Sequence, residues 1–128
     1  MIAEKLVSVS GASEVFVEGL VTYSNEAKMK RLDVKTETLD KFGAVSGETV
    51  EEMLKGLNTD IGIAVSGIAG PLGGTKEKPV GTVYIGIKIN EKKYINRHLF
   101  KGDRERIRIR ACYMAINNLL QILRKRAM

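Results

Sequence analysis

Apolar residues at both ends of the chain recur at helical spacing. Near the start, Ile2, Leu6 and Val9 fall on one face, which predicts a short helix over residues 1–9 that ends at Gly11. Towards the other end, Asp103 is placed to cap the last and longest helix. The apolar stripe of that helix consists of Cys112, Ala115, Ile116, Leu119, Leu120 and Leu123.

Four segments have the apolar content and β-branched residues typical of strands. Residues 15–22 form the first, and the almost wholly apolar run 61–65 has the pattern of a strand buried on both faces. Residues 80–89 and 93–100 are predicted to form a hairpin that turns at residues 90–92.

Three further helices are expected between the first two strands. They are Asn25–Leu32, with Glu26 in its first turn, a helical turn over Glu37–Phe42, and a helix that Ser46 caps and that runs to about Leu57. This order of elements predicts a single α/β domain over residues 1–128, with helices packed on a mixed sheet.

Composition narrows the class of protein. The chain has 128 residues, of which 44% are hydrophobic and 28% charged, as in ordinary soluble proteins. No apolar stretch approaches the roughly 20 residues of a membrane span. The single cysteine, Cys112, and the single histidine, His98, are expected to be structural, so neither a metal site nor a cofactor is predicted. We expect a soluble, cytoplasmic protein that is not bound to membranes.

The positive charge is concentrated in the last quarter of the chain. The formal net charge is +6, and nine cations face two carboxylates after residue 96. Such clustering attracts phosphate, in a polymer or in a small molecule. The chain lacks tryptophan and has no aromatic-rich strand on which bases could stack, which favours a small anion over nucleic acid.

A glycine-rich loop is the strongest candidate for chemistry. It runs from Ser66 to Pro79, directly after a buried strand, where ligands bind in open α/β sheets. Its glycines allow backbone amides to approach a ligand closely. The spacing matches neither a Walker A loop nor a dinucleotide fingerprint.

Two other clusters carry candidate site residues. Tyr23 precedes a predicted helix and Lys28 lies one turn inside it, where a desolvated lysine can act as a base and tyrosine can donate a proton or orient it. Arg104 and Arg108 lie on one face at the start of the last helix, where unpaired amides and guanidinium groups suit a phosphate.

These clusters make the sequence similar to a known family, the C-terminal domain of the competence/damage-inducible protein CinA, which contains nicotinamide-nucleotide amidohydrolases. The resemblance covers essentially the whole chain. The matching segments, in family order, are residues 11–16, 23–28 (Tyr-Ser-Asn-Glu-Ala-Lys), 43–46, 66–71 (Ser-Gly-Ile-Ala-Gly-Pro), 78–83 (Lys-Pro-Val-Gly-Thr-Val) and 100–104 (Phe-Lys-Gly-Asp-Arg).

The resemblance implies a three-layer α/β/α sandwich, self-association into a homo-oligomer, and hydrolysis of nicotinamide mononucleotide to nicotinic acid mononucleotide and ammonia. It implies Tyr23 and Lys28 as catalytic residues. The substrate-binding residues that it implies, together with the charge argument above, are Asn25, Ser66, Gly67, Ala69, Gly70, Arg104 and Arg108. Ser66 replaces the threonine that is usual in the family and keeps the hydroxyl group.

One departure affects the predicted activity. The family begins with a strand followed by a Glu-Ser-Cys-Thr-Gly-Gly motif whose serine is the nucleophile, and Met1 aligns just after that motif. We therefore expect a truncated domain that lacks its first strand and is inactive as written. The alternatives are a non-catalytic nucleotide-binding or oligomerisation module and a nucleic-acid-binding protein that uses the arginine-rich last helix.

Overall fold

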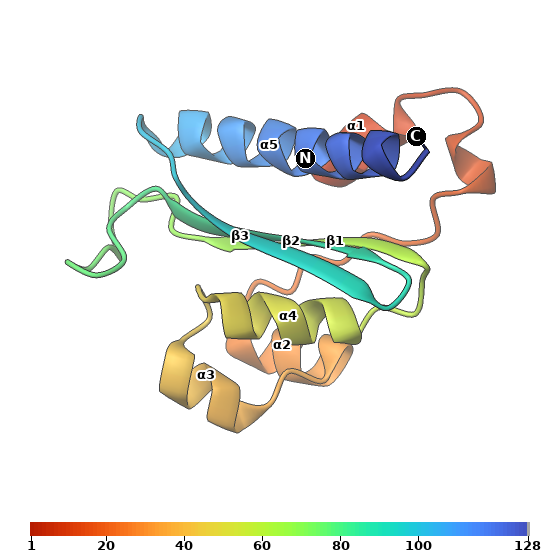
Figure 1. Cartoon of the computed structure of the whole chain (residues 1–128). Coiled ribbons are helices and arrows are strands. Elements are labelled where there is room, and N and C mark those ends of the chain that lie inside the picture. The colour runs from red at the N-terminus through yellow and green to blue at the C-terminus, as the bar shows by residue number, and fades with distance from the viewer. Residues whose placement is uncertain (128) are drawn as a thin grey trace.

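The computed structural model describes residues 1–127, which form three layers (Figure 1). Helices α1 (Ile2–Val7) and α5 (Arg104–Ala127) cover one face of a central sheet. The other face is covered by α4 (Gly47–Lys55), with α2 (Asn25–Leu32) and α3 (Thr36–Phe42) beside it. A one-turn 3₁₀ helix, η1, spans Ala12–Glu14. The predicted α/β/α sandwich is confirmed.

The sheet is a meander of three strands, β1 (Ile61–Gly67), β2 (Thr82–Ile89) and β3 (Lys92–Leu99), in the order β1-β2-β3. Both pairings are antiparallel. The expectation of a mixed sheet is therefore wrong for the described residues. Strand β2 lies in the centre, which explains why most of its side chains are buried.

Two apolar cores flank the sheet because each face carries its own set of side chains. Val50 and Leu54, both fully buried, pack from α4 against one face. Ile107 and Ala115 pack from α5 against Ile85 and its neighbours on the other face. The two cores hold the layers together and fix where the loops at the strand ends emerge.

The helices of the first half follow the sequence prediction closely. The hydroxyl oxygen of Ser24 accepts a hydrogen bond from the amide of Ala27 at 3.0 Å, and this starts α2. In the same way, Ser46 accepts a bond from the amide of Thr49 at 3.1 Å and starts α4. Both caps satisfy amide groups that the first helical turn leaves unpaired. The helix predicted over residues 1–9 is present but shorter, as α1.

The strand predicted over residues 15–22 is wrong. These residues follow η1 and form no regular secondary structure, and most of their apolar side chains face solvent, with Val15 81% and Val21 89% exposed. A strand needs a neighbouring strand for its hydrogen bonds, and none of the strands in residues 1–127 pairs with this segment. Within the same residues, no helix is both long and apolar enough to cross a bilayer.

Candidate functional site

Lys28 is a buried cation in the first half of α2. Its side chain is only 7% exposed, and its ammonium nitrogen donates a hydrogen bond to the carbonyl oxygen of Thr22 at 2.8 Å. Burial lowers the pKa of Lys28 below its ordinary value of 10.5, because removal from water disfavours the charged form. Lys28 therefore releases its proton more readily than a lysine in water.

Arg104 joins two of the three predicted clusters. It is the first residue of α5, and Nη1 of its guanidinium donates to the carbonyl oxygen of Gly70 at 2.8 Å. Nη2 of the same group donates to the phenol oxygen of Tyr23 at 3.2 Å. The glycine-rich loop, the start of α5 and the segment before α2 therefore meet at one cation. Lys28 is bonded to Thr22, the residue that directly precedes Tyr23 in the chain.

The glycine-rich loop is fastened to three separate elements by cationic side chains. Besides the bond from Arg104, Arg97 on β3 donates to the carbonyl oxygen of Glu77 at 2.8 Å. Lys78 donates to the carbonyl oxygens of Phe42 and Val45, at 2.7 and 2.6 Å, in the turn between α3 and α4. These bonds hold the two ends of the loop, and Leu72 at its tip is 86% exposed.

The remaining predicted site residues differ in their surroundings. Ser66 is buried, and its hydroxyl donates to the carbonyl oxygen of Ala44 at 2.8 Å, which fixes the start of the loop. Gly67 ends β1, and Ala69 follows it in the loop. Asn25 and Arg108 are exposed and, within residues 1–127, have no hydrogen bond to the loop or to Lys28. The structure thus brings together Tyr23, Gly70 and Arg104 by direct hydrogen bonds, with Lys28 bonded to the neighbouring Thr22.

Sequence reasoning did not single out Lys78 as a site residue. Its two carbonyl partners lie more than thirty residues earlier in the chain. The Lys-Pro-Val-Gly-Thr-Val segment shared with the family was the signal that could have identified it.

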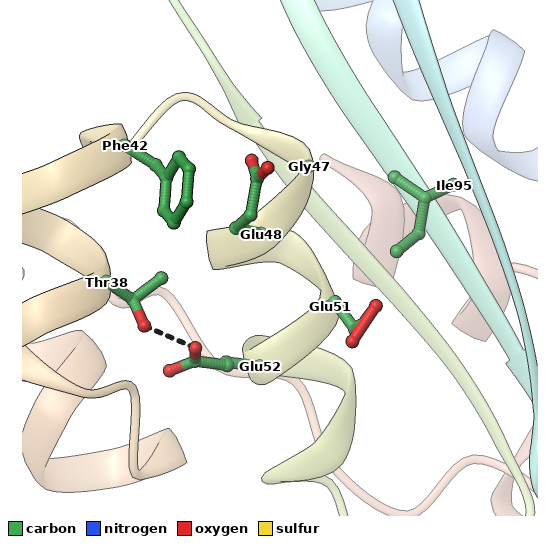
Figure 2. A pocket seen from close by; sticks show the side chains of 7 residues that line it. All are labelled: Thr38, Phe42, Gly47, Glu48, Glu51, Glu52 and Ile95. Carbon is green, nitrogen blue, oxygen red and sulfur yellow. Dashed lines mark hydrogen bonds between the residues drawn. The ribbon is translucent and has the colours of Figure 1, made fainter.

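A separate open hollow of about 290 Å³ lies between α3, α4 and β3 (Figure 2). Thr38 on α3 donates a hydrogen bond to Glu52 on α4, drawn as a dashed line, and the other carboxylate oxygen of Glu52 accepts from the amide of Lys35 at 2.8 Å. Glu48 and Glu51 also line the hollow. Three carboxylates repel a phosphate, so this hollow is not a suitable place for a nucleotide. Among residues 1–127, no three or more His, Cys, Asp and Glu side chains are grouped to hold a metal ion.

Fold and site together define an α/β/α domain in which cationic side chains fasten a glycine-rich loop and Tyr23 connects this loop to the segment that binds a buried lysine. Residues 1–123 match the family model of the CinA C-terminal domain, and the chain belongs to this family. The predicted resemblance is therefore confirmed.

Curated relatives are similar over nearly the whole chain. A CinA-like protein of Fusobacterium nucleatum is 63% identical over 127 residues, which are 98% of this chain and 31% of the relative. A CinA-like protein of Petrotoga mobilis is 55% identical over 98% of this chain and 32% of the relative. The chain therefore spans less than a third of the length of these two proteins.

Solved structures of the family have the same fold. The competence damage-inducible protein A of Klebsiella pneumoniae superposes with a TM-score of 0.91 and 36% identity, over 95% of this chain and 78% of that protein. A CinA superfamily protein of Escherichia coli gives a TM-score of 0.90 and 33% identity, over 94% of this chain and 73% of that protein.

Proposed function

We propose that the chain carries the base and the substrate-binding part of an amidase site that hydrolyses the carboxamide of nicotinamide mononucleotide. The observation that carries this proposal is the pair of hydrogen bonds from Arg104 to Gly70 and Tyr23, beside the buried Lys28. Arg104 would bind the phosphate, and its bonds connect it to the glycine-rich loop and, through Tyr23, to the segment that binds the lysine of lowered pKa.

The chemistry of an amide explains what each group would do. An amide carbon is a poor electrophile, so hydrolysis needs an activated nucleophile and donors for the oxyanion that develops. Lys28, once neutral, would accept the proton of the nucleophile. The phenol oxygen of Tyr23 accepts a bond from Arg104, which leaves its own hydrogen free to donate. The amides of Ala69 and Gly70 make no hydrogen bond within residues 1–127 and would serve as oxyanion donors.

The nucleophile is the missing part of this proposal. Ser46 and Ser66 donate their hydroxyl hydrogens to backbone carbonyls, and the hydroxyl oxygen of Ser24 accepts the capping bond of α2. We propose that the family's Glu-Ser-Cys-Thr-Gly-Gly serine follows a strand that pairs with the free edge of β1. The 128-residue chain alone would then bind the nucleotide without hydrolysing it.

A non-catalytic role in nucleotide binding is the second candidate, and the engagement of these serines favours it. The experiment compares the 128-residue chain with a version extended at its start by a strand and the serine motif. Ammonia release from nicotinamide mononucleotide by the extended version alone supports the amidase. Nucleotide binding without ammonia release by either version supports the binding module.

Substitution of Arg104 tests whether this residue contributes to binding of the nucleotide. Calorimetric titration with nicotinamide mononucleotide should show binding that Arg104→Met weakens at least about tenfold, because charge-assisted bonds to phosphate contribute roughly 1.5–3 kcal/mol. Arg31→Met removes the same charge from an exposed site on α2 and serves as the matched control. Equal affinity of the two variants contradicts the proposed substrate position.

We also propose that copies of this chain self-associate and that the protein works in the cytoplasm. The exposed Val15 and Val21 support self-association, since proteins normally cover such apolar surfaces. A monomeric mass in analytical ultracentrifugation at micromolar concentration would contradict it.

A further inference from the structure

Helix α5 has apolar residues on two sides, and the single stripe predicted from the sequence is divided between them, since Ala115 is buried whereas Leu120 is exposed. One stripe, which includes Ile107 and Ala115, is buried against the sheet. The other faces away from the sheet and consists of Ile109, Tyr113, Ile116 and Leu120, which we call the outer seam. A helix at the surface of a domain needs only the first stripe, so the second needs its own explanation.

The outer seam is exposed but narrow. Ile109, Tyr113 and Leu120 are 36%, 53% and 42% exposed, and Ile116 is half-buried. Their successive separations of four, three and four residues follow a heptad pattern. At 3.6 residues per turn these positions fall within about 60° of one another. A seam this narrow is suited to packing against one other helix. Insertion into a lipid surface requires a broader apolar face.

Charge lies along one side of the outer seam. Arg106, Arg110 and Arg124 share this side by helical spacing, and all three are exposed. The opposite side is occupied by α1, whose Lys5 ammonium lies 5.7 Å from the centre of the Tyr113 ring. After Glu105, the described part of α5 contains no acidic residue.

We propose that the outer seam of α5 docks an acidic amphipathic helix of a partner protein. The arginines beside the seam favour a partner helix with negatively charged residues. Apolar side chains of the partner helix would pack on Tyr113 and its neighbours, while its flanking carboxylates would face Arg106, Arg110 and Arg124. A second copy of α5 would instead bring two sets of arginines together, which is unfavourable. This surface is independent of the proposed nucleotide site.

The probe is a labelled synthetic helix of about 20 residues, with leucine at heptad positions a and d and glutamate beside them. Its binding to the 128-residue chain is followed by fluorescence anisotropy. We expect saturable binding that weakens as salt is raised and that a lysine-flanked version of the peptide lacks.

Two substitutions locate the binding. Tyr113→Ser should weaken it at least about tenfold, because tyrosine is enriched among the few residues at the centre of an interface that dominate its affinity. Arg124→Glu should weaken it severalfold. Lys76→Glu makes the same change of charge in the exposed glycine-rich loop and should leave binding unchanged. Circular dichroism confirms that each variant is folded.

Several outcomes would overturn the proposal. These are absence of binding, equal binding of the lysine-flanked peptide, or equal effects of Arg124→Glu and Lys76→Glu. The proposal also fails if Tyr113→Ser converts a dimer of the chain to a monomer, because the seam is then a contact between copies. Binding of anionic vesicles or of duplex DNA that Tyr113→Ser weakens, without binding of the acidic peptide, would assign the face to those partners instead.

Discussion

Gly81 lies between the glycine-rich loop and the segment that leads into α5, and replacing it with alanine is expected to be severely destabilising. Its φ angle is +98°, and a Cβ atom added to it would lie 2.0 Å from the carbonyl oxygen of Phe100. Its amide donates to the carbonyl oxygen of Ile68 in the glycine-rich loop at 2.8 Å, and its own carbonyl accepts from the amide of Phe100 at 2.9 Å. Gly81 therefore ties the base of the loop to the segment that leads into α5.

The structure allows the cost of Gly81→Ala to be estimated. An alanine in a left-handed conformation costs about 1–2 kcal/mol. Relief of the contact with Phe100 requires a backbone movement of roughly 1 Å, since ordinary contacts of this kind exceed 3 Å. That movement breaks the bond between the amide of Phe100 and Gly81 and leaves buried polar groups unpaired, at about 1–3 kcal/mol. The sum is about 2–5 kcal/mol, a large part of the 5–15 kcal/mol typical of a domain.

Gly11→Ala is the matched control for the Gly81 substitution. Gly11 has a φ angle of +89°, but a Cβ atom added to it would have no neighbour within 4 Å. Urea unfolding followed by circular dichroism should show that Gly11→Ala loses only the conformational cost of about 1–2 kcal/mol. Equal losses for the two variants, within about 0.5 kcal/mol, would refute the steric reasoning.

Three further predictions concern buried groups. Burial lowers the pKa of Lys28, so between that lowered value and the ordinary 10.5 the unfolded chain binds more protons than the folded chain. The free energy of unfolding of the wild type, measured relative to that of Lys28→Met, should therefore rise as the pH approaches 10.5. A difference between the two proteins that is independent of pH would contradict this. The amide nitrogen Nδ2 of Asn118 is buried without a partner in residues 1–127, so Asn118→Leu should raise the free energy of unfolding by about 1 kcal/mol, whereas the exposed Asn117→Leu should change it by less than about 0.5 kcal/mol. Leu54 is fully buried under the sheet, and Leu54→Ala should lower the same quantity by about 2–5 kcal/mol in urea unfolding; a smaller loss would indicate that the core collapses into the cavity.

Features with a local cause could be predicted from the sequence. The hydroxyl of Ser46 caps the very next turn, so the start of α4 follows from a few neighbouring residues. The strand predicted over residues 15–22 failed for the opposite reason. Its β-branched residues favour an extended backbone, but a strand also requires a partner that lies elsewhere in the chain.

In the candidate site, too, local features could be predicted from the sequence, whereas contacts between distant residues could not. Tyr23, Gly70 and Arg104 could each be recognised by residue type and by the element that carries them. The contact between them could not be predicted, because Arg104 and Tyr23 are separated by 81 residues and only the packing of the layers brings them together. Lys78 was missed for a similar reason, since its partners are backbone carbonyls that have no signature in the sequence.

The fastening of the glycine-rich loop has a consequence for how its sequence can vary. Arg97, Lys78 and Arg104 all bind main-chain carbonyl oxygens, which every residue type supplies. Side chains at the exposed tip, such as Leu72 and Lys76, can therefore be exchanged without loss of the anchors that set the course of the loop. The tip is accordingly a suitable place for mutational drift or for a randomised library, in which new ligand preferences arise on an unchanged framework.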